Sequence, residues 1–592
     1  MAGHGLSKSR IVAWKQCPKR LWLQIHRRDL LEVSGDAERG FQVGHEVGEV
    51  AQSLFPEGFL IGDDDDLSAA LAATQAALVA HPEKPLFEAT FQHDGVLVRA
   101  DLLLPTPGGY RLVEVKASAS VKPCHLVDCA VQAWVLRQNG MALASIELAH
   151  IDTAFVYPGD GNYHGLLHHA PLDAEVSDLM AQVPGWVQAA RTTLAGDEPD
   201  IAPGAHCDDP FECPFKAYCN RAVVQPARPA YSLDVFTRMR ASTKTDLRRL
   251  GFEDARDVPE VHLNALQRRI QRVSQSGVAE LTREAAQTLA ELPYPRCYLD
   301  FETITLAVPR WPHTSPYRTQ VPFQWSCHTE SAAGQLRHAM FLDTSGHDPR
   351  RDCAQSLVAA LGSEGPVFVY SEGFEKGRIA ELAALFPDLA PALAAINQRI
   401  VDLLPLARSS YCHPAMRGSW SLKAVLPTLA PDLDYNGLLV GNGGDAQDAY
   451  REILHPDTTV ARKQALAEGL RDYCTLDTLG LVRLAWFLEG YTLCTFLPAL
   501  TSGTPSQWDA SKMKKAPDPL LHSAEELLRQ YCLQAHTRTV IQPKSYLQRH
   551  LKIGFSHATF LMNQLEACGV LSPQGQAPGS AGSFLSGMPP RD

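Results

Sequence analysis

The chain has 592 residues, enough for about four domains of ordinary size. Hydrophobic residues make up 45% and charged residues 20%, which is ordinary for globular protein and excludes a collagen-like, coiled-coil or wholly disordered chain. With 66 acidic against 54 basic side chains the formal charge is −12, so nucleic-acid binding would need local basic surfaces or metal ions.

The amino-terminal residues lack the apolar core of a signal peptide, and no run of eighteen apolar residues appears. We therefore expect a cytoplasmic chain without a membrane span. Cytosolic cysteines stay reduced, so a cluster among the 14 cysteines indicates a metal site more than a disulfide framework. Composition and turn residues predict six regions: an N-terminal domain (1–226), a helical connector (227–292), a third region (293–500), a linker (501–518), a small C-terminal domain (519–574) and a tail (575–592).

Two strands separated by a turn are predicted in the first domain, over 96–104 and 110–116. Strand side chains alternate, so Glu114 and Lys116 point the same way, and a hairpin brings Asp101 beside them. Two carboxylates can hold Mg²⁺ or Mn²⁺, and a nearby lysine can orient or deprotonate a water for phosphodiester attack. On its own, Glu-x-Lys on a strand more often marks a solvated face.

This arrangement resembles the PD-(D/E)XK nucleases, and its surroundings resemble their RecB-like members. The resemblance implies a restriction-endonuclease-like fold, a metal-ligand role for His45 on a helix-like stretch, and a DNA contact for Gln132 on the apolar helix after the second strand. The tyrosine that usually follows this glutamine is replaced by Leu136. A lone histidine or glutamine is more often structural.

Four cysteines give a second signal in this domain. Cys207, Cys213 and Cys219 are separated by five residues each, and Cys17 lies far upstream. Four thiolates can hold an iron–sulfur cluster or Zn²⁺. A distant first cysteine with a late trio resembles the CRISPR-associated RecB-like exonucleases, which implies a 4Fe-4S cluster that ties the two ends of the domain together. Zn²⁺ stays open as the alternative because the spacing is looser than in those proteins.

The third region begins with a strand signal over 296–303 that carries Asp300 and Glu302 on one side of the expected sheet. Two carboxylates on a buried strand are costly unless they are paired or bind a metal. Further strands are expected over 323–327 and 338–342, and a strand that leads into a helix over 367–375. Tyr473 and Asp477 share one face of a later helix.

These motifs resemble the DEDD exonucleases of the RNase H-like fold, in the subclass that uses tyrosine. The resemblance implies that mononucleotides leave from a 3′ end and that Tyr473 orients the attacking water. Glu375 stands where the family has aspartate, with Glu372 as an alternative ligand, and Lys423 is either a phosphate contact or an exposed surface lysine. Two divalent ions, which would stabilise the attacking and leaving oxygens, would be held by Asp300, Glu302, Glu375 and Asp477.

The C-terminal domain is predicted to hold helices over 523–532, 545–551 and 556–568, with a glycine in the turn between the last two. It resembles the gamma domain of FtsK-type DNA translocases, which implies a winged helix that binds duplex DNA. A winged helix used for protein contact is the alternative. The recognition helix would begin with Ser556, His557 and Thr559, and the phosphate contacts would be Lys544, Arg549 and Lys552.

The sequence thus predicts an α/β multidomain, metal-dependent exodeoxyribonuclease: a RecB-like PD-(D/E)XK domain, an RNase H-like DEDD domain and a winged helix. The pairing resembles a bacterial family of RecB-like nucleases fused to an RNase H-like exonuclease. Its expected partners are single-stranded 3′ ends, duplex DNA, and proteins of DNA repair or defence. The alternatives are an RNA exonuclease and a DNA-binding scaffold with one inactive nuclease site.

Overall fold

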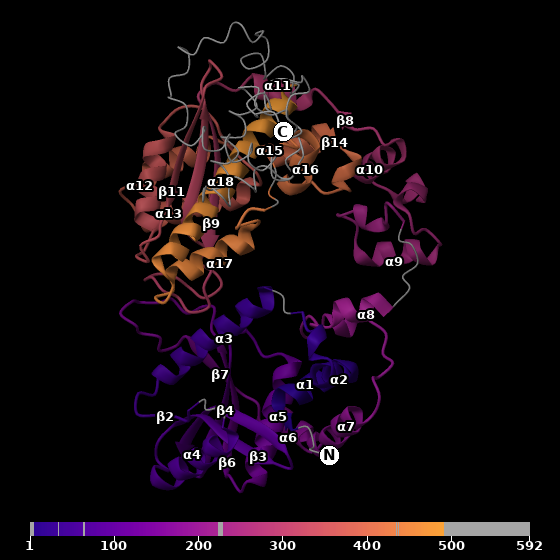
Figure 1. Cartoon of the computed structure of the whole chain (residues 1–592). Helices are drawn as coiled ribbons and strands as arrows, with labels where there is room; N and C mark the ends of the chain where they lie inside the picture. The colour runs from indigo at the N-terminus through magenta and orange to yellow at the C-terminus, as the bar shows by residue number, and fades with distance from the viewer. Residues whose placement is uncertain are drawn as a thin grey trace, which may run out of the picture. The chain divides into compact units, whose positions relative to one another are not determined.

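The computed structural model describes residues 5–32, 35–62, 66–222, 229–433, 435 and 437–490. The chain forms two compact units, each of which mixes helices and strands (Figure 1). The first unit combines Met1–Arg228 with Thr305–Gln320, and the second combines Pro229–Ile304 with Val321–Asp592. The predicted linker, winged helix and tail lie outside the described residues, and so do Lys544, Arg549, Lys552, Ser556, His557 and Thr559.

The first unit is built on a seven-stranded mixed sheet in the order β2-β3-β4-β5-β6-β7, with β1 beside β4. The two predicted strands are confirmed as an antiparallel hairpin that pairs Leu102 with Val113, and the first strand runs two residues further than expected. α5 then connects β5 to the parallel strand β6. The strands are β1 (Leu6–Ser7), β2 (Phe59–Leu60), β3 (Leu86–His93), β4 (Val96–Thr106), β5 (Gly109–Lys116), β6 (Leu143–Ile151) and β7 (Leu167–Pro171).

α5 is the central helix of this unit, and its apolar side chains are buried against β3 and β4 together with residues of α1 and α7. The segment 305–320 belongs to the same unit: Ala307 joins a core cluster with Val47 and Phe87. The helices are α1 (Lys8–Gln16), α2 (Pro18–His26), α3 (Gly35–Ser53), α4 (Leu67–Ala80), α5 (Pro123–Gln138), α6 (Asp173–Met180), α7 (Val183–Ala195) and α8 (Lys216–Ala222).

The second unit is built on a five-stranded sheet in the order β11-β10-β9-β12-β13. The predicted strands are confirmed. The first three strands form an antiparallel meander, and β12 and β13 run parallel to β9. The strands are β9 (Arg296–Ile304), β10 (Val321–Glu330), β11 (Leu336–Leu342), β12 (Val367–Val369) and β13 (Ile400–Asp402), and a separate pair joins β8 (Glu280–Leu281) to β14 (Tyr411–Cys412).

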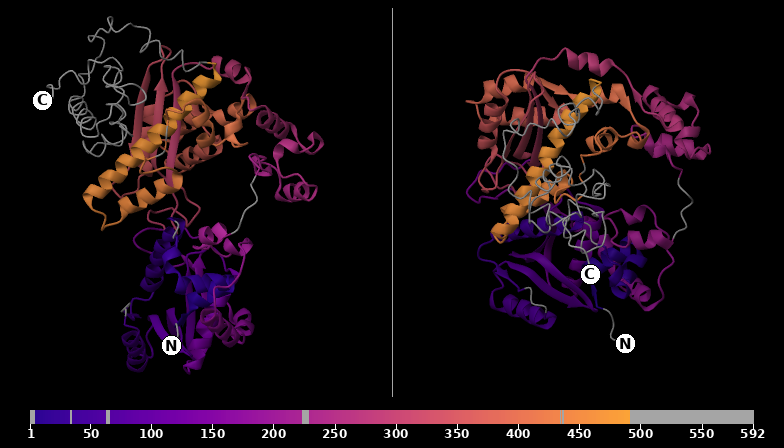
Figure 2. Two further views of the ribbon diagram at one scale, coloured as in Figure 1. Left: turned by 45° about the vertical axis from the view of Figure 1, so that its right-hand side comes forward. Right: turned by 45° about the horizontal axis from the view of Figure 1, so that its top comes forward.

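Both faces of this sheet are covered by helices. Cys297, Leu299 and Phe301 pack in a cluster with residues of α12, α13 and α14, whereas Tyr298 packs in a different cluster with residues of α16 and α18. The long helix α18 crosses the second face of the sheet (Figure 2). Because side chains alternate along a strand, Asp300 faces α18. The helices are α12 (Arg350–Leu361), α13 (Glu372–Leu385), α14 (Ala390–Gln398), α15 (Leu403–Ser410), α16 (Leu422–Leu429), α17 (Gly443–Leu454) and α18 (Val460–Leu488).

The region predicted as a separate connector is instead part of the second unit. Its helices α9 (Ala241–Arg249), α10 (Ala265–Ser276) and α11 (Glu284–Ala290) bury apolar residues such as Leu247 and Ile270 in the same cluster as Tyr298. Among the described residues, no helix is both long and apolar enough to cross a membrane.

Candidate active sites

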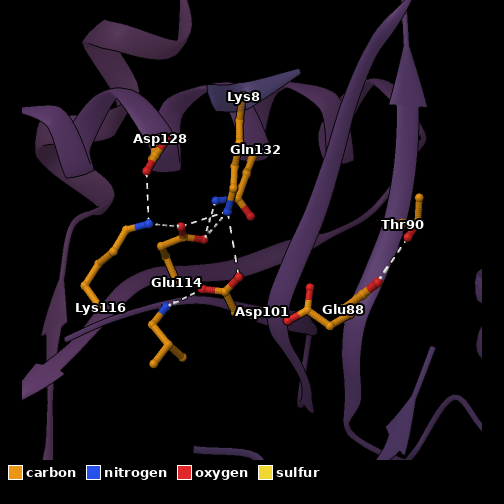
Figure 3. A network of polar contacts seen from close by, with 9 residues as sticks. Lys8, Glu88, Thr90, Asp101, Glu114, Lys116, Asp128 and Gln132 are labelled. Carbon is orange, nitrogen blue, oxygen red and sulfur yellow. Dashed lines mark hydrogen bonds and ion pairs between the residues drawn. The ribbon is translucent and has the colours of Figure 1, made fainter. Parts of the chain in front are cut away.

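Glu114 lies at the centre of a buried polar cluster in the first unit (Figure 3). Its side chain is 1% exposed and accepts hydrogen bonds from Lys116 Nζ at 2.6 Å, from Lys8 Nζ at 2.8 and 2.9 Å, and from Gln132 Nε2 at 2.5 Å. Burial alone would raise the pKa of Glu114, but Lys116 and Lys8 hold it well below its usual range. Glu114 is therefore an ionised carboxylate at neutral pH.

Asp101 faces the same cluster from β4. Its Oδ2 accepts a hydrogen bond from the backbone N–H of Val115 at 2.7 Å, and its Oδ1 lies 3.7 Å from Lys8 Nζ. Burial and the nearby charge of Glu114 raise the pKa of Asp101 to about 7. Lys116 reaches Asp128 on α5 at 3.1 Å. The hairpin thus brings together the predicted trio of Asp101, Glu114 and Lys116.

Two other predicted residues of this domain are placed differently from expectation. Gln132 is fully buried on α5 and donates to Glu114, so it holds a catalytic candidate in position and offers no surface to DNA. Its Oε1 is buried with no hydrogen-bond partner in the structure. His45 is 80% exposed on α3 and pairs with Glu49 at 3.3 Å, outside the cluster around Glu114.

Lys8 is the residue of this site that sequence reasoning missed. It lies 106 positions before Glu114, at the start of α1, and no local motif marks it. Lys8 reaches the site because β1 pairs with β4, which places the start of α1 beside the strand that carries Asp101. Such long-range pairing is not visible in the residue pattern of Leu6–Ser7.

All four predicted cysteines line one small cavity of about 10 Å³ in the first unit. Cys17 ends α1, Cys219 lies on α8, and the other two lie on the loop between α7 and α8, where the Cys213 N–H donates to the Cys207 carbonyl at 2.7 Å. Among the described residues, no three of these sulfurs lie within 4.8 Å of one another. The cavity gathers all four predicted thiols.

The second unit brings three of its predicted acids, Asp300, Glu302 and Asp477, together between β9 and α18. Asp300 and Glu302 extend from β9 toward α18, and their carboxylate oxygens lie within 4.8 Å of each other and of Cys474 Sγ. Asp477 lies on α18 and accepts a hydrogen bond from the Tyr435 hydroxyl at 2.6 Å and another from Tyr473. Tyr435 and Cys474 were not predicted: a lone tyrosine in a loop carries no signal, and no spacing singles out Cys474 among the other cysteines.

Burial and mutual repulsion raise the pKa values of these acids. Burial, followed by the charges of Asp477, Glu302 and Glu375, raises the pKa of Asp300 well above its ordinary value. Burial and Asp477 raise the pKa of Glu302 to about 8, and burial raises the pKa of Glu375 to about 8. Glu375 Oε2 is buried with no hydrogen-bond partner in the structure. A divalent cation would relieve this repulsion, because it favours the ionised form of every acid around it.

Two further predictions concern the edge of this site. Glu372, the alternative ligand, has a 44% exposed side chain that pairs with Lys376 at 2.6 Å, so Glu375 is the acid that faces Asp300. Lys423 is exposed; its Nζ donates to the Gly441 carbonyl at 2.6 Å and lies 5.2 Å from the centre of the Tyr473 ring. Its charge acts on the carboxyls of Glu302 and Asp477, where it lowers the pKa against the effect of burial.

A cavity of about 370 Å³ opens at the ends of the elements that carry these side chains. Ser371 in its wall directly precedes α13, which carries Glu375, and Ser421 directly precedes α16, which carries Lys423. Arg238 and Arg408 complete its polar lining. Two guanidinium groups suit an anionic ligand.

Comparison with known proteins gives two matches. A family model described as "Domain of unknown function (DUF2779)" matches residues 297–421, a stretch that contains Asp300, Glu302 and Glu375. The chain is also similar to "Uncharacterized protein UU173" of Ureaplasma parvum serovar 3, with 22% identity over 232 residues. That match covers 36% of this chain and spans about a third of the relative's length (33%). Neither description states an activity.

Proposed function

We propose that the second unit is a metal-dependent 3′–5′ exonuclease of the DEDD type. The observation that carries this proposal is the approach of four carboxylates from three elements. Asp300 and Glu302 on β9 lie on the face of the sheet that α18 covers with Asp477, and Glu375 in the first turn of α13 is close enough for its charge to act on Asp300. The antiparallel meander followed by parallel strands supports an RNase H-like fold, and the pairing of Tyr473 with Asp477 supports the tyrosine subclass.

The chain's own residues divide the work as follows. Asp300, Glu302, Glu375 and Asp477 would hold divalent ions, which supply charge neutralisation and a water of lowered pKa when bound. The Tyr435 hydroxyl fixes the orientation of Asp477, and Tyr473 orients the attacking water. Lys423 neutralises charge on the scissile phosphate. Arg238 and Arg408 bind the DNA strand that leads to this phosphate.

We propose for the first unit a second nuclease centre of the PD-(D/E)XK type. Asp101 and Glu114 are its metal-binding carboxylates, and Lys116, anchored between Glu114 and Asp128, activates the water. The oxygen donors of two convergent carboxylates suit Mg²⁺ or Mn²⁺. The substrate proposed for both units is DNA.

We propose that the cysteine cavity holds a 4Fe-4S cluster. Cys17, Cys207, Cys213 and Cys219 line the same cavity, and four thiolates are the ligand set of such a cluster. Zn²⁺ bound by the same four thiolates is the alternative.

End-labelled single-stranded DNA, duplex DNA and RNA, incubated with the full chain and Mn²⁺, test both centres. Asp300→Asn should reduce release of mononucleotides from the 3′ end by about 100-fold or more, because a lost metal ligand removes several kcal/mol of transition-state stabilisation. Glu114→Gln should remove a separate set of products. Asp388→Asn changes an exposed acid paired with Arg351 and serves as the control.

Two outcomes would contradict this proposal. Unchanged products from Asp300→Asn would make the second unit a scaffold. Faster cleavage of RNA than of either DNA substrate would assign the exonuclease to RNA instead.

A further inference from the structure

Lys8 occupies the space between the two carboxylates of the first site (Figure 3). Its Nζ lies 2.8 and 2.9 Å from the two oxygens of Glu114 and 3.7 Å from Oδ1 of Asp101. Its side chain is 21% exposed. A point shared by two convergent carboxylates is also the point at which a divalent ion would be bound.

The oxygens of Glu114 leave little room for an ion while Lys8 is present. Oε1 accepts from Lys8 and Lys116, and Oε2 accepts from Lys8 and Gln132. Mg²⁺ needs oxygens at about 2.0–2.1 Å, well inside the distances at which an ammonium nitrogen lies from its acceptors. The ion and the ammonium therefore need the same oxygens.

The net charge of the cluster is consistent with replacement of the Lys8 ammonium by a divalent ion. Three acids, Asp101, Glu114 and Asp128, face two lysines, Lys8 and Lys116. When all five of these groups are ionised, and Glu88 beside Asp101 is left out of the count, their net charge is −1 with Lys8 in place and −2 without its ammonium. One divalent ion would neutralise the cluster after Lys8 has moved.

Lys8 is held by its helix and is not a loosely tethered surface residue. Ser7 Oγ accepts from the Arg10 N–H at 3.3 Å at the start of α1, and Ile11 is fully buried. At the other end of α1, Gln16 Nε2 donates to the carbonyls of His206 and Phe211 at 2.8 and 2.7 Å. The backbone position of Lys8 is thus fixed, and only its side chain must rotate to vacate the site.

We propose that Lys8 is an internal counter-ion of the first site, whose ammonium and a divalent cation bind the same carboxylates in turn. Lys8 then sets how tightly the site binds metal and stabilises the metal-free protein. The inference rests on the proposed metal-dependent role of the first unit, and the test below separates the two.

Mn²⁺ binding to the full chain is measured by titration calorimetry in an Asp300→Asn background, which weakens the second unit's site. Lys8→Met should tighten Mn²⁺ binding by about tenfold or more, since one buried ammonium no longer competes and tenfold corresponds to only about 1.4 kcal/mol. Lys8→Gln, which keeps a hydrogen-bond donor, should do the same. Lys15→Met changes another lysine of α1, whose Nζ lies over the Trp186 ring, and should leave binding unchanged.

A measurement on the Asp300→Asn chain with Lys8 intact does not depend on the folding of a Lys8 variant. Reactivity of Lys8 toward an amine-acetylating reagent, followed by peptide mass spectrometry, should rise when Mn²⁺ is added, whereas that of Lys15 should not. Suppose that Mn²⁺ binding is lost in Glu114→Gln but is unchanged or weaker in both Lys8 variants. The metal site would then stand, and only the role of Lys8 would be overturned. Mn²⁺ binding indifferent to Glu114→Gln would overturn the metal site of the first unit and the inference with it.

Discussion

Two groups of buried acids in this chain are stabilised in opposite ways. In the first unit, lysines lie against Glu114 and lower its pKa. In the second unit, burial is the main cause that raises the pKa values of Asp300, Glu302 and Glu375, and the charge of Asp477 adds to it at Asp300 and Glu302. A buried acid with a raised pKa stores a proton that a metal ion must displace. Metal binding by the second unit should therefore strengthen as pH rises toward about 8.

Glu375 gives a direct test of this proton storage. Its pKa is raised to about 8 in the folded chain, whereas an unfolded glutamate titrates near 4.5, so the folded state holds the extra proton between these values. The metal-free protein should lose stability as pH rises through that window. Glu375→Gln should flatten this loss and raise the melting temperature at pH 8 by about 2–4 °C per kcal/mol recovered.

Thermal unfolding in a chelating buffer between pH 5 and pH 8 provides the measurement. Glu372→Gln removes an exposed acid of the same helix and should keep the slope of the unchanged protein. Identical slopes for Glu375→Gln and the unchanged protein would show that the Glu375 carboxyl ionises normally.

Most of the chemistry-bearing residues could be predicted from the sequence, since alternation along a strand or spacing along a helix placed each pair. Asp300 with Glu302, and Tyr473 with Asp477, are examples. Lys8 and Tyr435 could not be predicted, because they reach Glu114 and Asp477 from 106 and 42 residues away. Gln132 was found, but its burial depends on how α5 packs.

Among the secondary-structure elements, α1 and the loop between α7 and α8 together define the cysteine cavity. Cys17 ends α1, and Gln16 binds the carbonyls of the loop that carries Cys207 and Cys213. Three evenly spaced cysteines and the distant Cys17 were the sequence signal for this cavity. The helix contacts that bring the four thiols together could not be predicted from the sequence, because they join residues nearly 200 positions apart.

Cys213→Ala tests the cysteine cavity at the level of these elements. Protein purified without oxygen should be brown, and this variant should lose its iron and melt at a lower temperature, because ligation contributes folding energy. Cys129→Ala changes a buried cysteine of α5 outside the cavity and should keep its iron. Stoichiometric zinc without iron in the unchanged protein would replace the cluster by a zinc site.

For the whole chain, the observed division is into two units with separate cores. The strands predicted for the two proposed nuclease regions are found in the structure, in the predicted order along the chain. The sequence did not indicate that the connector packs with Tyr298, or that 305–320 belongs to the first unit. Both assignments depend on which apolar faces meet in three dimensions, and periodicity reports only that such faces exist.

A truncation tests the role proposed for the C-terminal residues. Deleting everything after Pro519 removes Lys544, Arg549 and Lys552 but none of the proposed catalytic carboxylates. Duplex binding should weaken, and its logarithmic salt slope should fall by about 0.9 per lost phosphate contact. Cleavage of short single strands should survive. Equal duplex affinity and salt slope with and without these residues would assign them to protein contact.

The nine residues of α1 connect two kinds of chemistry. Lys8 begins the helix inside the carboxylate site, and Cys17 follows its end at the thiol cavity, about 13 Å away at 1.5 Å per residue. Oxidation of the thiols would disturb the contacts at the C-terminal end of α1, and Lys8 lies at the N-terminal end of the same helix. Because one short helix carries both residues, a change at the thiol cavity that shifts its end would also shift Lys8 at its start.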